Sequence, residues 1–297
     1  MTAYELDAYS PTQREEYLRL LRDAWGPAAL SGEEFDWWFD RNPAGSLRSV
    51  ARTNGRVVGV AGHSLYRMIL EGDERLATFS VHATTDPATR GQGVFPALER
   101  RHEAEAQALA AAVVLAFASK PTAPIFLGPL GWTEVGRLRI WARPLPALLR
   151  SRRLAADEVE RFDLEEDAAA GWPNHIVRDS TFLNWRYAES PRRYRLFRSS
   201  DGYAVLGHKL HRGRPIALIA DLVAREPRRL LRTCLSAVRS DARALFALPS
   251  RDQRSAYLSL GFVPTHLSLH FLGKSLAGAL NPDPRAWRFT LGDTDFF

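Results

Sequence analysis

The stretch "TTDPATRGQGVF", residues 84–95, has the clearest chemical signature in the chain. Gly91 and Gly93 allow positive φ and let a ligand approach the backbone closely. Pro96 fits only the first turn of a helix, so a helix should begin directly after these glycines. No good N-cap lies between Arg90 and Gly93, which leaves the first helical N–H groups without a partner. Together with the helix dipole and Arg90, these groups predict an anion site; the alternative is a solvated glycine turn.

The sequence offers three candidate groups for proton transfer besides this loop. His82 lies on the strand ahead of it, and histidine titrates near neutral pH, so it is a candidate base. The alternative is a strand histidine satisfied by its neighbours. The carboxylate of Phe297 would be a good base if the terminal "DTDFF" were buried in a cleft, and otherwise the tip is solvated or frayed. Asp221, in "LIADLV", is a weaker candidate acid at a strand end.

The composition excludes several other functions. The chain has 40 Lys and Arg against 34 Asp and Glu, a net charge of +6, and its basic residues are almost all arginine. A GC-rich genome or an electropositive surface for anionic ligands would explain this bias. Basic and aromatic residues do not alternate, so we expect no nucleic-acid partner. The single cysteine, Cys234, excludes an internal disulfide and has no zinc-ligand partners, so we expect no metal.

The chain also lacks the marks of a membrane or secreted protein. No run approaches the ~20 apolar residues that cross a bilayer. The first residues show no signal-peptide pattern. We therefore expect a cytoplasmic protein with no membrane partner.

The elements that must position the loop follow from the hydrophobic periodicity. The loop should join a strand ending near Thr85 to a helix. The expected helices of the first half are 11–24, 33–40, 94–110 and 122–130, and the expected strands are 48–53, 56–66, 75–84, 112–118 and 133–143. The C-terminal tail is expected to be irregular and to end in one short strand.

The chain also repeats itself. Each copy reads as an aromatic helix, a Pro-containing turn, a strand, a tight hairpin turn and another strand. Several landmarks share an offset of 147 or 148 residues. They are Trp37 and Trp185, Pro43 and Pro191, and the turn pairs Asn54-Gly55 and Asp201-Gly202. We expect two copies of one α/β unit, at 1–150 and 151–297, with the boundary between 145 and 165.

The first copy resembles the Gcn5-related N-acetyltransferase (GNAT) superfamily. The resemblance rests on a strand, then "DPATRGQGVFPAL", an Ala-rich helix, an apolar strand and "LGW". Arg90 and Gly93 match the signature Gln/Arg-x-x-Gly-x-Gly/Ala, but Phe95 stands where Gly or Ala is usual. The resemblance covers about residues 33–143 well and about residues 180–272 weakly. It implies an α/β fold of two GNAT-like units, each a mixed, mostly antiparallel sheet flanked by helices: an acyl-CoA-binding unit and a degenerate unit with a C-terminal tail.

The resemblance implies acetyl-CoA, or another acyl-CoA, as co-substrate. Backbone amides of the loop would hold the pyrophosphate, and the strand ahead would pair with the pantetheine arm. A strand amide would also polarise the thioester carbonyl. The cofactor-binding residues implied are Ala83, Thr84, Thr85, Arg90, Gly91, Gln92, Gly93, Val94 and Phe95.

Many GNAT enzymes place a catalytic tyrosine four residues before a Gly-aromatic pair. The first copy has Leu127 there. The second copy has Tyr257, which becomes a candidate catalytic residue or else an inherited packing residue. In the family, early helices wall the acceptor site, so Asp36, Trp37 and Trp38 are expected acceptor-binding residues. Aromatic core packing is the alternative for the two tryptophans.

The expected function is acyl-CoA-dependent transfer of an acetyl group to an amine of a small molecule. One alternative is a non-catalytic CoA-binding or sensing module, because the usual tyrosine is missing. Another is an aminoacyl-type transferase of the peptidoglycan-bridge kind. Such enzymes generally do not need the phosphate loop, so "RGQGVF" argues against this alternative.

Overall fold

A computed structural model describes residues 4–145, 156–211, 213–238, 241–278 and 280–295. The chain divides into two compact units. The first comprises Met1–Gly136 and His270–Asp283, and the second comprises Arg137–Leu269 and Pro284–Phe297. Each unit therefore takes residues from both halves of the sequence, whereas the sequence suggested a single boundary between 145 and 165.

The first unit contains a mixed sheet in the order β1-β2-β3-β4-β5-β13. Neighbouring strands are antiparallel except β4 and β5, which are parallel. The hairpin from β2 to β3 turns at Asn54 and Gly55, both with positive φ, as a type I′ turn requires. The strands are β1 (Glu5–Ala8), β2 (Ser46–Thr53), β3 (Arg56–Leu70), β4 (Asp73–Thr85), β5 (Val113–Ala118) and residues 270–275 of β13 (Val263–Ser275).

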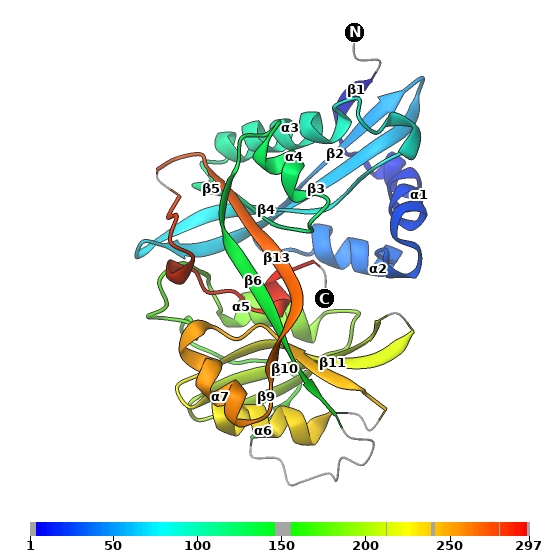
Figure 1. Cartoon of the computed structure of the whole chain (residues 1–297). Helices are drawn as coiled ribbons and strands as arrows, with labels where there is room; N and C mark the ends of the chain where they lie inside the picture. The colour runs from blue at the N-terminus through cyan, green and yellow to red at the C-terminus, as the bar shows by residue number, and fades with distance from the viewer. Residues whose placement is uncertain (1–3, 146–155, 212, 239–240, 279, 296–297) are drawn as a thin grey trace. The chain divides into compact units, whose positions relative to one another are not determined.

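The helices of this unit match the sequence expectations within a few residues. They are α1 (Arg14–Trp25), α2 (Gly32–Phe35), which continues as a π-helical turn over Asp36–Asp40, α3 (Val94–Ala108) and α4 (Ala123–Leu127). Helix α3 packs on β2, β3 and β4 (Figure 1). Strand β1 was not expected from the sequence.

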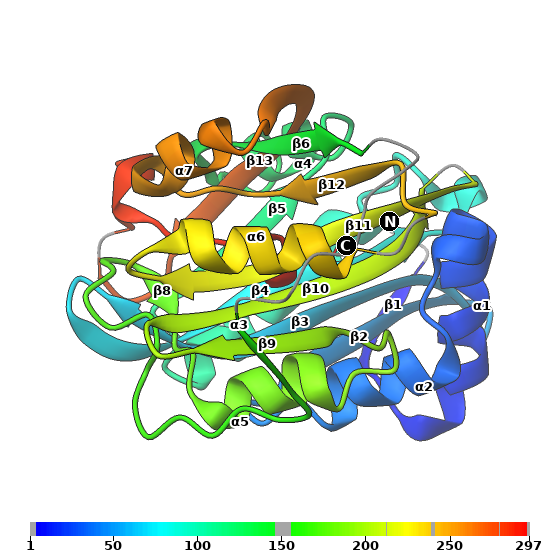
Figure 2. The same cartoon turned by 90° about the horizontal axis from the view of Figure 1, so that it is seen from below.

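The second unit contains a sheet in the order β7-β9-β10-β11-β12-β6. Helix α6 lies against β10 and β11 (Figure 2). The strands are residues 137–144 of β6 (Thr133–Pro144), β7 (Asp157–Val159), β8 (His175–Ile176), β9 (Arg195–Ser199), β10 (Gly202–His211), β11 (Arg214–Ala224) and β12 (Ala244–Ala247). The helices are α5 (Ser180–Leu183), continued by a π-helical turn over Asn184–Ala188, α6 (Pro227–Ala237) and α7 (Arg254–Ser259).

The two units repeat one topology. In each, three antiparallel strands are followed by a helix and then by a strand parallel to the third. The short α-helix that becomes a π-helical turn also recurs, at Asp36–Asp40 and at Asn184–Ala188. These two turns begin 148 residues apart, which is the offset of Trp37 and Trp185. The internal repeat predicted from the sequence is confirmed.

The last strand of each repeat is exchanged. Strand β5 pairs with residues 270–275 of β13, which come from the second half of the sequence. Strand β12 pairs with residues 141–144 of β6, which come from the first half. Each sheet is thus completed by a strand from the other repeat.

The C-terminal segment differs from the expectation. The described residues 280–295 contain 3-10 turns at Pro284–Ala286 and Leu291–Asp293 and no strand. Thr290 and Asp293 form a capping box at the start of the second turn. Among the described residues, no helix is long and apolar enough to cross a membrane.

Candidate functional site

The glycine loop lies between β4 and α3, as the sequence predicts. Asp86 accepts a hydrogen bond from the Ala88 amide at 2.9 Å and starts a short 3-10 turn. Gly91 and Gly93 then take φ values of +78° and +80°. Gly93 is the N-cap of α3 and makes no side-chain cap hydrogen bond. Both glycines therefore use the positive φ that glycine allows.

The loop leaves a set of backbone N–H groups available. The amide of Gln92 donates to Thr89 O at 3.3 Å, and its side chain donates to Ala88 O at 3.1 Å, so Gln92 serves the turn itself. A Cβ on Gly91 would meet nothing within 4 Å, so the space beside it is open. Four amides make no hydrogen bond to a described residue: those of Gly91, Gly93, Val94 and Phe95. Such amides at a helix N-terminus suit an anionic ligand.

Phe95, the departure from the family signature, has a packing role. Its ring lies edge-on to Phe126 of α4, with centroids 5.4 Å apart, and Phe126 in turn contacts Trp132. The side chain therefore belongs to a hydrophobic cluster, while the amide stays in the loop.

Beside the loop, β4 and β5 separate. They pair in parallel only from Ala77 and Val113 to Phe79 and Leu115. Strand β4 continues to Thr85 and β5 to Ala118, and no pairing joins these last residues among those described. The partly exposed residues Ala83, Thr84 and Thr85 lie on this separated stretch. A backbone edge is therefore open next to the loop.

His82 occupies a bulge in the same stretch of β4. The register with β3 shifts between Val60 and Gly62, and His82 takes a φ of +49°. The residue is 5% exposed, and its ring lies among aromatic rings, with its centroid 4.9 Å from that of Trp38 and 6.0 Å from those of Phe39 and Trp25. Because a positive φ is costly for a residue other than Gly, this bulge is a strained feature at the opening between β4 and β5.

The three expected acceptor residues differ in their exposure to solvent. Trp37 and Trp38 are fully buried, and the indole of Trp38 donates to Ser64 Oγ at 2.7 Å. Asp36 stays accessible, with 45% of its side chain exposed, and pairs with Arg14 at 3.0 Å. In this structure, only Asp36 of the three offers a side chain to an approaching ligand.

Tyr257 and Leu127 lie in different units. Leu127 is exposed at the end of α4. Tyr257 is buried in the core of the second unit against Phe262, with ring centroids 5.1 Å apart. Burial raises the pKa of Tyr257 well above its ordinary value, so its phenol stays protonated.

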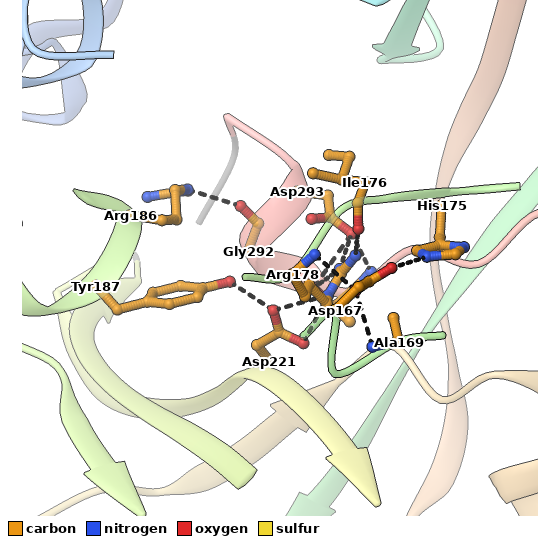
Figure 3. A network of polar contacts seen from close by, with 11 residues as sticks. Asp167, Ala169, His175, Ile176, Arg178, Arg186, Tyr187, Asp221, Gly292 and Asp293 are labelled. Carbon is orange, nitrogen blue, oxygen red and sulfur yellow. Dashed lines mark hydrogen bonds and ion pairs between the residues drawn. The ribbon is translucent and has the colours of Figure 1, made fainter. Parts of the chain in front are cut away.

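Asp221 is not the accessible acid that its strand-end position suggested. It is completely buried, and its carboxylate accepts from Arg178 Nε at 3.2 Å and from Tyr187 Oη at 3.0 Å (Figure 3). Arg178 also donates to Asp293 at 2.7 Å, and Arg186 donates to Gly292 O at 2.9 Å. This network fixes the C-terminal segment within the second unit. Phe297 lies outside the described residues.

No protein-family model and no curated protein matches this sequence. Solved structures do match. Saccharomyces cerevisiae N-myristoyltransferase with bound myristoyl-CoA has a TM-score of 0.68 at 12% identity, covering 92% of this chain and 83% of that one. A GCN5-related N-acetyltransferase from Anabaena variabilis has a TM-score of 0.65 at 12% identity, covering 92% and 73%. One from Kribbella flavida has a TM-score of 0.62 at 16% identity, covering 92% and 71%. The chain therefore has the fold of the Gcn5-related N-acetyltransferase superfamily.

Proposed function

We propose that this protein is an acyl-CoA-dependent N-acyltransferase that moves an acetyl group to an amine of a small molecule. The observation that carries the proposal is the pairing of two features in the first unit. Four amides without a partner among the described residues lie at the start of α3, and β4 separates from β5 directly beside them. A pyrophosphate fits the amides, and an extended thioester arm fits the open strand edge.

In this proposal the amides of Gly91, Gly93, Val94 and Phe95 donate to the pyrophosphate, and the exposed Arg90 adds positive charge. Ala83, Thr84 and Thr85 hydrogen-bond through their backbone to the pantetheine arm. The strained bulge at His82 redirects the backbone of β4, so that an amide there is aimed at the thioester carbonyl and stabilises the developing oxyanion. Acetyl-CoA supplies the activated acyl group.

The amine must lose a proton to attack the carbonyl carbon. His82 is the proposed acceptor of that proton, directly or through water, with the Phe297 carboxylate as the alternative. As the C–N bond forms, the C–S bond breaks and the electron pair leaves on sulfur. A thiol of pKa near 8.5 leaves readily as the thiolate. The reaction therefore needs no proton donor at the position of Leu127, where many GNAT enzymes have a tyrosine.

The second unit is proposed to bind no acyl-CoA. Its turn before α6 lacks glycine: Glu226 is the N-cap, and Pro227 is the first helical residue. A carboxylate would repel a pyrophosphate, and proline has no N–H to donate. We therefore propose one acyl-CoA site per chain.

The test is turnover of acetyl-CoA with a panel of small amines, followed through free CoA with a thiol reagent. The protein itself does not interfere, because burial raises the pKa of Cys234, the single cysteine, to about 12. Amine-dependent release of CoA, with the acetylated amine identified by mass spectrometry, would support the proposal. Tight CoA binding without turnover of any amine would favour a sensing module instead, and an absence of CoA binding would contradict both.

A further inference from the structure

A second cluster of chemically active side chains lies within the first unit. His63 of β3 and Glu99 and His102 of α3 are completely buried. Each offers one possible ligand atom, and these atoms lie within 4.8 Å of one another. Glu99 and His102 are three residues apart and therefore share one face of the helix.

Two of these side chains are already oriented by a further hydrogen bond. His63 Nε2 lies 3.0 Å from Glu99 Oε2, and its other ring nitrogen, Nδ1, lies 3.0 Å from Thr78 Oγ1. The second carboxylate oxygen of Glu99 accepts from Ser80 Oγ at 2.9 Å. Metal-binding histidines and carboxylates in proteins are typically held in this way by outer partners. A hydroxyl both donates and accepts, so Thr78 suits His63 in either tautomer.

His102 is the member of the cluster whose ring nitrogens find no hydrogen-bond partner among the described residues. Its ring nevertheless lies only 4.6 Å from that of His63. A buried polar group without a partner destabilises the folded state, so such groups are rare.

We propose that His63, Glu99 and His102 form a binding site for one divalent transition-metal ion, with Zn²⁺ as the best match to two imidazoles and one carboxylate. The ion binds between His63 Nε2 and Glu99 Oε2, with His102 as the third ligand. His63 then carries its proton on Nδ1, where Thr78 Oγ1 accepts it. Three protein ligands leave a fourth position for water.

This ion would have a structural role. It would join α3 to β3 through Glu99 and His102, which follow the first turn of α3. The ion would therefore stabilise the helix whose N-terminus carries the glycine loop. The sequence did not indicate the site because 36 residues separate His63 from Glu99, and only the folded sheet brings them together.

The first experiment uses the full chain after removal of metals with a chelator. Zn²⁺ is titrated against a competing chromophoric chelator, and Co²⁺ is added separately as a spectroscopic probe. We expect one Zn²⁺ per chain, visible absorption of four-coordinate Co²⁺, and a raised melting temperature with either ion. A chain that holds no Zn²⁺ and whose melting temperature does not respond to it would overturn the proposal.

Variants separate this site from surface binding. His102→Leu should weaken Zn²⁺ binding by more than about 100-fold, and Thr78→Val by about 10- to 100-fold, as expected for loss of a ligand and of an outer partner. Without metal, His102→Leu should melt no lower than wild type, because the imidazole it removes has no partner. The control is His266→Gln, which changes an exposed histidine and should leave Zn²⁺ binding intact. If the site variants bound Zn²⁺ like the control, the proposal would be wrong. Glu99→Gln gives the same test should His102→Leu fail to fold.

Discussion

Phe95 follows the glycines of the loop and packs edge-on against Phe126, with ring centroids 5.4 Å apart. Its amide and its side chain therefore serve different purposes. The amide is one of those available at the start of α3, while the ring joins the cluster that contains Phe126 and Trp132. A bulky residue is tolerated at this position because its side chain points into the unit rather than toward the ligand site.

This division predicts the behaviour of Phe95→Ala. The free energy of unfolding should fall by about 1–3 kcal/mol, because a partly buried ring leaves the aromatic cluster. The affinity for acetyl-CoA should change by less than about threefold, since alanine keeps the amide. Denaturant titration and calorimetry measure the two quantities, and a large loss of affinity at unchanged stability would show that the ring itself contacts the ligand.

The proposed base predicts that His82→Asn lowers kcat by about 100-fold or more. Asparagine tolerates the positive φ of this position, so the bulge should persist, but it cannot accept the proton. The acidic limb of the pH–rate profile should change, while the affinity for acetyl-CoA should not. Deletion of Phe297 is the parallel test of the alternative base. Normal rates in both variants would eliminate both candidates and leave water as the proton acceptor.

The buried network of the second unit predicts a stability effect. Arg178→Met leaves Asp221 and Asp293 buried without their guanidinium, so the free energy of unfolding should fall by about 3–5 kcal/mol. A matched control is Arg161→Met, whose exposed pair with Glu189 should contribute less than about 1 kcal/mol. Urea denaturation of both variants gives the comparison. Equal losses would mean that the buried network does not hold the second unit together.

The exchanged strands predict that a fragment of residues 1–150 is poorly soluble. It lacks residues 270–275 of β13, which cover the edge of β5 in the first unit. An open edge beside buried apolar residues favours aggregation. Size-exclusion chromatography of the fragment and of the full chain tests this expectation. A monomeric, fully active fragment would show that the first unit does not need the strand.

Much of the local structure was predictable from the sequence. Turn pairs such as Asn54-Gly55 specify hairpins through backbone conformation alone, and the glycines around Gln92 specify the start of α3. The exchange of β6 and β13 was not predictable, because an apolar pattern reports burial and not the partner strand. The burial and pairing of Asp221 were not predictable for a similar reason. Only the fold brings Arg178 and Tyr187 into hydrogen-bonding distance of its carboxylate.

The most direct test of the proposed function is calorimetry of acetyl-CoA binding to wild type, Gly93→Glu and Gly72→Glu. Gly93 and Gly72 both have positive φ, but Gly72 lies in the turn between β3 and β4, away from the loop. The two variants thus share the backbone strain and the added charge, and only the first places a carboxylate among the loop amides. We predict one acetyl-CoA per wild-type chain, no detectable binding by Gly93→Glu, and near-normal affinity in Gly72→Glu. Binding by folded Gly93→Glu within about twofold of wild type would contradict the phosphate-loop assignment.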